Sequence, residues 1–126
     1  MTTQFEELEV WKRSARLSVE IYKVLRDCRD YSFKDQLSRS GLSVPSNIAE
    51  GFERESLKES LNFLSYAKGS CGELRTQTYI GIKIGYIDTV TGTRWIAESK
   101  QISVMLAGLI RTRRNFVRQQ SRTAPT

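Results

Sequence analysis

Apolar residues recur at spacings of three and four along most of this chain, which is the period of an amphipathic helix. The pattern predicts helices over about residues 7–29, 33–53, 57–84 and 89–117. No stretch shows the alternating pattern of a strand. Short turns separate the four segments, so we expect an all-α, antiparallel, up-down-up-down four-helix bundle. We expect a single domain over residues 1–126, with a frayed tail from about residue 119.

Polar residues and one glycine mark the expected helix ends. Residues 56–59 read Ser-Leu-Lys-Glu, which is the spacing of a capping box at the start of the third helix. Ser32 is a candidate N-cap for the second helix, and Asp88 or Thr89 for the fourth. Gly85 fits the left-handed conformation that commonly ends a helix.

Pro45 lies inside the second helical segment. Proline has no backbone N–H, and its ring clashes with the carbonyl four residues earlier. We therefore expect a kink between Gly41 and Pro45, with two short helices separated by a break as the alternative. Gly41 would also allow a neighbouring helix to come close.

The third segment contains a run of small residues, which are Ala67, Gly69, Ser70, Cys71 and Gly72. A glycine costs roughly 1 kcal/mol inside a helix, so we expect another helix to pack closely against this run. Trp11 and Trp95 fall on the apolar faces of the first and fourth segments, and we expect both to anchor the core.

Composition narrows the chemistry. The chain has no histidine, which removes Ser-His-Asp and Cys-His catalysis and histidine-bound metals. Neither glycine-rich phosphate-binding pattern occurs. The two cysteines, Cys28 and Cys71, lack metal-ligand spacing and fit a reducing cytosol. No apolar run is long enough to span a membrane, and we expect no signal peptide, because residues 1–9 carry acids instead of a basic and an apolar stretch. We expect a cytoplasmic protein that is not an enzyme and uses no cofactor or metal.

The formal net charge of +6 comes largely from the C-terminus, where residues 111–122 contain five arginines and no acid. Arg111, Arg114 and Arg118 recur at three and four, so they form one basic stripe if the fourth helix continues that far. Together with Arg113 they are candidate nucleic-acid-binding residues, because such a stripe neutralises backbone phosphates. A solvated basic helix end, favoured by the helix dipole, is the alternative.

Asn47, Glu50 and Arg54 are also spaced three and four apart and share one polar helix face. A Glu–Arg ion pair beside an asparagine bonded to a helix end would make this face structural. A ligand or partner site on the same face is the other interpretation. Catalysis is disfavoured, since the sequence offers Glu50 neither a nucleophile nor a metal.

Several segments carry a resemblance to a known family. Among them are Phe5-x-x-Leu8-x-Val-Trp11, Ser43-Val-Pro-Ser-Asn-Ile-Ala-Glu-Gly51-x-x-Arg54 and Gly69-Ser70-x-x-Glu73. From Phe5 to about Arg111 the chain resembles the 23S rRNA intervening-sequence proteins, which are encoded by reading frames inserted in bacterial ribosomal RNA genes. One departure is Gln36-Leu-Ser-Arg39, which has one residue more than the family's Q-x-R. The resemblance implies an antiparallel four-helix bundle that assembles as a homopentamer. It also implies a likeness to the accessory proteins of diversity-generating retroelements.

Two functions remain open. The first is a non-enzymatic, oligomeric bundle that binds RNA or DNA through basic surface residues. The alternative is a protein-assembly or accessory module whose partner is a retroelement reverse transcriptase. Exposed tyrosines could stack on nucleobases, although an edge of the core is the more common role for Tyr31, Tyr66, Tyr79 and Tyr86.

Overall fold

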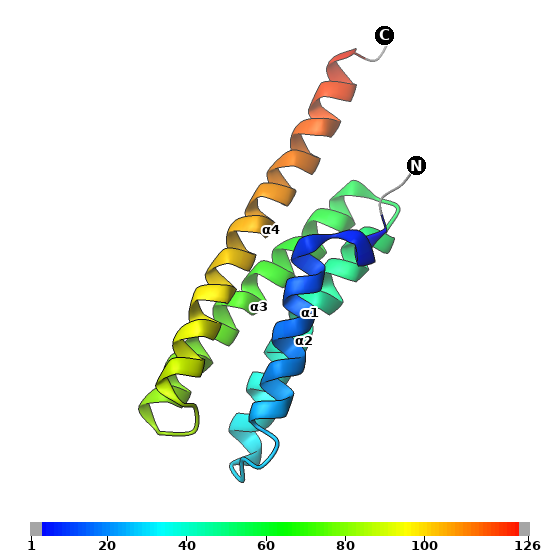
Figure 1. Cartoon of the computed structure of the whole chain (residues 1–126). Coiled ribbons are helices and arrows are strands. Elements are labelled where there is room, and N and C mark those ends of the chain that lie inside the picture. The colour runs from blue at the N-terminus through cyan, green and yellow to red at the C-terminus, as the bar shows by residue number, and fades with distance from the viewer. Residues whose placement is uncertain (1–3, 124–126) are drawn as a thin grey trace.

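The computed structural model describes residues 4–123, and side chains over residues 4–115. A single 3₁₀ turn, η1 (Phe5–Glu7), precedes four helices, which are α1 (Glu9–Val24), α2 (Tyr31–Glu53), α3 (Leu57–Lys83) and α4 (Thr89–Thr123). Each helix packs against the next one along the chain, and α4 also packs against α1 (Figure 1). The described part of the chain contains no strand. The predicted all-α, up-down-up-down four-helix bundle is confirmed.

The ends of α1 and the start of α2 differ from the prediction. Leu8 is extended and separates η1 from α1, so α1 begins later than expected. At the next turn, the Asp30 carboxylate accepts a hydrogen bond from the backbone N–H of Phe33 at 3.1 Å. Asp30 is therefore the N-cap of α2, and the predicted cap, Ser32, lies inside the first turn. An aspartate caps as well as a serine does, and its carboxylate also suits the positive end of the helix dipole.

The caps of α3 were predicted correctly. The Ser56 hydroxyl accepts a hydrogen bond from the Glu59 backbone N–H at 3.1 Å. At the other end Gly85 has a φ of +82°. This left-handed residue lets the N–H groups of Tyr86 and Ile87 both reach the carbonyl of Gly81.

The second helix is unbroken, and the fourth helix is longer than predicted. α2 runs without interruption through Pro45, so the alternative of two short helices is wrong, and the kink stays a prediction. α4 continues to Thr123, beyond the predicted end near Val117. The residues from Gln119 to Thr123, expected to fray, are helical, and 124–126 lie outside the described residues. Asp88 caps α4, because its carboxylate accepts a bond from the Thr91 N–H at 3.2 Å.

The core runs along the bundle axis and includes Trp95, which is fully buried as predicted. Trp11 is only half-buried and packs at the edge of the core, with its ring 5.3 Å from that of Phe5. Cys71 is buried, and burial raises the pKa of its thiol to about 11. The largest fully buried side chains besides Trp95 are Ile21, Leu25, Leu37, Ile48, Leu64, Leu74, Ile102 and Leu106.

Only some of the small residues of α3 pack closely against another helix, although the sequence predicted this for the whole run. Ala67, Ser70 and Cys71 are buried, but a Cβ atom added to Gly69 or Gly72 would meet no atom within 4 Å. No described helix therefore packs against these two glycines, and the expected close packing is not found at them within this chain. Close approach occurs instead at Gly41, as predicted, where an added Cβ would lie 3.0 Å from Ile21 Cδ1.

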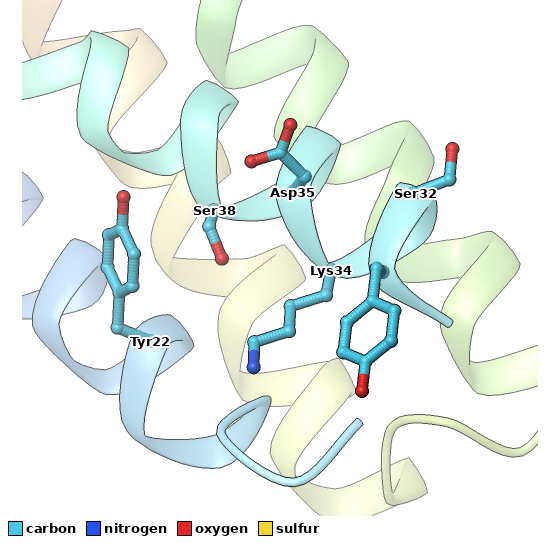
Figure 2. Close-up of a pocket in the computed structure, with 6 residues that line it drawn as sticks. Tyr22, Ser32, Lys34, Asp35 and Ser38 are labelled. Carbon is cyan, nitrogen blue, oxygen red and sulfur yellow. The ribbon is translucent and has the colours of Figure 1, made fainter. Parts of the chain in front are cut away.

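The turn between α1 and α2 leaves a solvent-open hollow of about 480 Å³ (Figure 2). Lys34 spans its base and donates a hydrogen bond from Nζ to the carbonyl of Arg26 at 2.7 Å. This bond satisfies one of the carbonyls left free near the end of α1.

Candidate functional site

The basic end of α4 is the first candidate site. Arg111 and Arg114 are exposed, and Arg118 lies beyond the residues whose side chains the structure describes. Because α4 is a continuous helix as far as Thr123, the backbone positions of these three arginines fall on one face, as predicted.

Arg113 is placed differently from its neighbours. Its guanidinium carbon lies 4.2 Å from the ring centre of Phe52, at the last turn of α2, which is cation–π geometry. Its Nη1 is buried and has no hydrogen-bond partner among the described residues. Burial lowers the pKa of the Arg113 guanidinium from its usual value. Arg113 therefore fastens α4 to the end of α2, and this contact leaves it less accessible to phosphates than Arg111 and Arg114.

The sequence does contain a signal for this difference. Arg113 follows Ile110 by three residues and Leu106 by seven, so it continues the buried face of α4. Its long side chain can lay its stem and planar head against apolar surface, which a shorter polar residue could not do.

The helix beyond Arg113 projects from the bundle. Because Arg113 contacts the last turn of α2, residues 114–123 extend past the end of that helix. They correspond to about 15 Å of helix at 1.5 Å per residue. In Figure 1 this part of α4 rises well clear of the turn between α2 and α3.

The polar residues Asn47, Glu50 and Arg54 do not converge on one point. Arg54 forms an ion pair with Glu50 at 2.6 Å, and its guanidinium carbon lies 4.7 Å from the ring centre of Phe63. Asn47 instead donates to the carbonyl of Ser43 at 2.9 Å and to its hydroxyl at 2.8 Å. The expected Glu–Arg pair is present, whereas the expected bond from Asn47 to a helix end is not.

Asn47 belongs to a polar network between α2 and α3. The Ser43 hydroxyl, which accepts from Asn47, lies 2.8 Å from the hydroxyl of Ser70. A shallow groove of about 330 Å³ runs beside this network. It brings together residues from two of the segments that resemble the known family, although no sequence spacing links them. The groove is lined by Gln36, Arg39, Ser40, Ser43, Ser70, Glu73 and Gln77.

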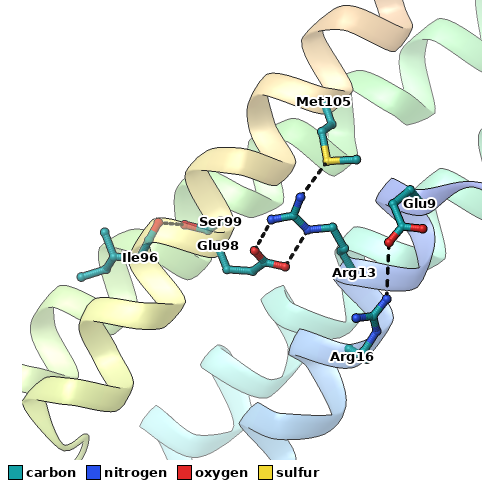
Figure 3. Close-up of polar contacts among 7 residues, drawn as sticks. All are labelled: Glu9, Arg13, Arg16, Ile96, Glu98, Ser99 and Met105. Atoms are coloured by element: carbon teal, nitrogen blue, oxygen red, sulfur yellow. Dashed lines mark hydrogen bonds and ion pairs between the residues drawn. The ribbon is translucent and has the colours of Figure 1, made fainter.

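Ion pairs join α1 to α4 along a second groove. Arg13 forms a two-point contact with the carboxylate of Glu98, with Nε 2.9 Å from Oε2 (Figure 3). Arg94 pairs with Glu20 in the same way, with Nη1 2.9 Å from Oε2. Hydrogen bonding from Arg13 lowers the pKa of Glu98, and hydrogen bonding from Arg94 lowers that of Glu20. The charges of these two ion pairs neutralise one another, so the groove serves to hold α1 against α4 and is a poor site for an anion.

We expect Glu98→Gln to lower the free energy of unfolding by about 1–2 kcal/mol at pH 7, because the Arg13–Glu98 pair is two-point and only about 28–29% exposed. The pKa of folded Glu98 lies below the ordinary value of 4.5, so the stabilisation is complete above pH 4.5 and is lost as the pH falls through the folded pKa. Thermal unfolding of parent and variant should therefore converge in acid.

Glu9→Gln is the matched control for this prediction. Glu9 pairs with Arg16 at 3.5 Å, and both side chains are more than 60% exposed. Its replacement should change stability by less than about 0.5 kcal/mol. If the difference in the free energy of unfolding between the parent and Glu98→Gln stayed constant from neutral pH to acid, the Arg13–Glu98 ion pair would not be its cause.

Within the described residues, no three carboxylate or thiol groups gather as metal ligands would. No described helix is long and apolar enough to cross a bilayer.

Comparison with known proteins identifies the family. The sequence profile of the 23S rRNA-intervening sequence proteins matches residues 6–108. The chain belongs to this family. A crystal structure from the S23 ribosomal protein family of Bacteroides thetaiotaomicron, a protein of unknown function, has 26% sequence identity and a TM-score of 0.75. The alignment covers 80% of this chain and 97% of that chain. No curated protein matches.

The family match covers one of the two candidate sites and ends before the other. The signature residues Asn47, Glu50 and Arg54 lie inside the matched region, and Arg111, Arg113, Arg114 and Arg118 lie after it. The family profile therefore says nothing about the basic end of α4.

Proposed function

We propose that this protein is a non-enzymatic, cytoplasmic nucleic-acid-binding bundle that holds RNA or DNA by its backbone phosphates. The observation that carries the proposal is the basic end of α4, which projects beyond the bundle. From Ser99 onward the chain contains six basic residues and no acidic one, so this stretch accounts for the whole net charge of +6. Exposed cations on a projecting helix can reach a polyanion without competition from nearby carboxylates.

The mode of binding follows from the kind of contact. Arg111 and Arg114 are exposed and form no ion pair among the described side chains. Guanidinium groups can bind phosphate oxygens in a two-point geometry. Such contacts release counterions and carry no base information, so binding should be sequence-independent and strongly salt-dependent.

Replacing Arg111, Arg114 and Arg118 with glutamine should weaken binding to generic single-stranded RNA or DNA by at least about tenfold at low salt. The matched control is the triple variant Lys12→Gln, Arg16→Gln and Lys68→Gln. It makes the same change in net charge with exposed residues of α1 and α3. Fluorescence anisotropy with a labelled oligonucleotide measures both variants.

The control variant should lose much less affinity, and both should keep the parent's helical circular dichroism. Equal losses in the two variants would show that only overall charge matters and that α4 is not the site.

A second candidate function, a protein-assembly module, is favoured by one face of α3. Gly69, Gly72, Thr76 and Ile80 form a stripe on the side of α3 opposite the core, and we call it the glycine stripe. Its glycines face open space, and the side chain of Ile80 is exposed. Since helix-interior glycines are unfavourable in an isolated bundle, the stripe fits close packing against another chain. We propose a homo-oligomer, a pentamer by family resemblance, and a reverse transcriptase remains the alternative partner.

A further inference from the structure

The hollow at the α1–α2 turn holds an unpartnered buried hydroxyl. Ser38 is 5% exposed, and its Oγ has no hydrogen-bond partner among the described residues. Figure 2 shows this hydroxyl directed into the space between Tyr22 and Lys34. Two other helical serines, Ser14 and Ser99, donate their hydroxyls to carbonyls three residues earlier, whereas Ser60 is unpartnered like Ser38 but lies outside the hollow. A buried hydroxyl left unpaired destabilises a fold, so Ser38 marks a place where a bound group can supply the missing partner.

Two tyrosines line the same hollow. Tyr22 is 45% exposed and Tyr31 is 72% exposed. Tyr66 and Tyr86 each pack edgewise on a phenylalanine, whereas Tyr22 and Tyr31 have no aromatic partner among the described residues. Unpaired rings at the rim of a hollow offer stacking surface to a flat ligand.

The net charge that faces the hollow is positive. The Lys34 ammonium uses one of its three N–H donors on the Arg26 carbonyl, which leaves two for a ligand. The carboxylate of Asp35, also on the rim, pairs with Arg39 at 3.0 Å. In Figure 2 the Asp35 carboxylate points away from Lys34. An anionic group is therefore favoured beside Lys34.

We propose that this hollow binds one nucleotide, with the base against Tyr22 and Tyr31, the base edge bonded to Ser38, and the phosphate at Lys34. The volume of about 480 Å³ lies within the usual range for small-ligand sites. The nucleotide is either free or one unit of a single strand, since both present the same base and phosphate. The site lies at the end of the bundle opposite the projecting part of α4, so it does not depend on the α4 arginines (Figure 1).

The test uses uridine and adenosine monophosphate as free ligands, with ribose 5-phosphate as the ligand that lacks a base. Binding is followed by two-dimensional NMR of the full chain. Tyr31→Leu should weaken nucleotide binding by about 5- to 100-fold, the range for loss of one stacking ring. Tyr79→Leu, which removes another exposed tyrosine on α3, should leave binding unchanged.

Ser38→Ala separates a ligand site from a packing defect. It should keep or raise the melting temperature, because it removes an unpaired buried hydroxyl, and weaken nucleotide binding about three- to tenfold. Ser60→Ala is the control, since the Ser60 hydroxyl is also buried and unpartnered but lies outside the hollow. It should have a similar effect on the melting temperature and none on binding.

Oligonucleotides distinguish the source of the nucleotide. Saturable binding of a free monophosphate that Tyr31→Leu weakens supports a free-nucleotide site. Preference for an intact single strand over an abasic strand, lost in Tyr31→Leu, supports a strand-bound base. If neither monophosphate binds and intact and abasic strands bind equally, or if Tyr31→Leu and Ser38→Ala bind as the parent does, the proposal is overturned. The α4 triple variant should still discriminate against the abasic strand, so this test and that of α4 can fail separately.

Discussion

Gly81→Val should destabilise the bundle by about 2–4 kcal/mol, although valine is ordinarily at least as good a helix residue as glycine. A Cβ at position 81 would lie 2.5 Å from Ile87 Cδ1 and 2.7 Å from Phe33 Cζ. These atoms come from two separate elements, α2 and the turn before α4, and Ile87 is buried in the core, so room for the added methyl groups requires side chains of both elements to shift. Chemical denaturation followed by circular dichroism measures the change.

Gly108→Val is the matched control, because it places the same residue inside another helix. An added Cβ at position 108 would meet only the end of the flexible Arg111 side chain, at 4.0 Å. Its stability should stay within about 0.5 kcal/mol of the parent or rise slightly. Equal losses at both positions would show that the packing around Gly81 has been misassigned.

Gly69→Leu combined with Gly72→Leu should convert the proposed assembly into a 14.5 kDa monomer that is still helical. Two leucines would fill the open face of the glycine stripe and prevent close approach of a second backbone, while a Cβ at either position meets no described atom within 4 Å. The effect is large because every interface of a closed ring would contain the same change. Sedimentation velocity at micromolar concentration measures the mass.

Thr93→Leu combined with Ala97→Leu controls for added apolar surface, since both residues are exposed on α4. This control should assemble as the parent does. A parent that is monomeric, or a glycine-stripe variant that still assembles, would exclude this face as the interface.

Helix periodicity and local capping chemistry were sufficient to predict the fold. The α3 caps at Ser56 and Gly85 depend on residues a few positions apart, and both were predicted correctly. The α2 cap was missed because Asp30 and Ser32 both fit the pattern, and only the path of the turn decides between them. The length of α4 was underestimated, because weak apolar periodicity after residue 117 does not by itself end a helix.

The candidate sites were less predictable, because they depend on contacts between helices. The pattern identified Arg111 and Arg114 as surface residues, but the Arg113–Phe52 contact joins positions 61 residues apart. The same holds for the network of Ser43 with Ser70 and for the hollow that brings Tyr22 near Ser38. The glycines of α3 illustrate the limit most clearly, since the composition of the run does not tell which of them face the core.

The salt dependence of nucleic-acid binding tests the central claim most directly. The affinity of the parent and of the Arg111, Arg114 and Arg118 glutamine variant for one unstructured single strand is measured between about 50 and 200 mM salt. If these arginines contact phosphates, the logarithm of affinity should fall linearly with the logarithm of salt concentration, and the slope for the variant should be shallower by about two units per protomer bound. Identical slopes and affinities for the two proteins would show that the basic end of α4 is a solvated helix terminus and not a nucleic-acid site.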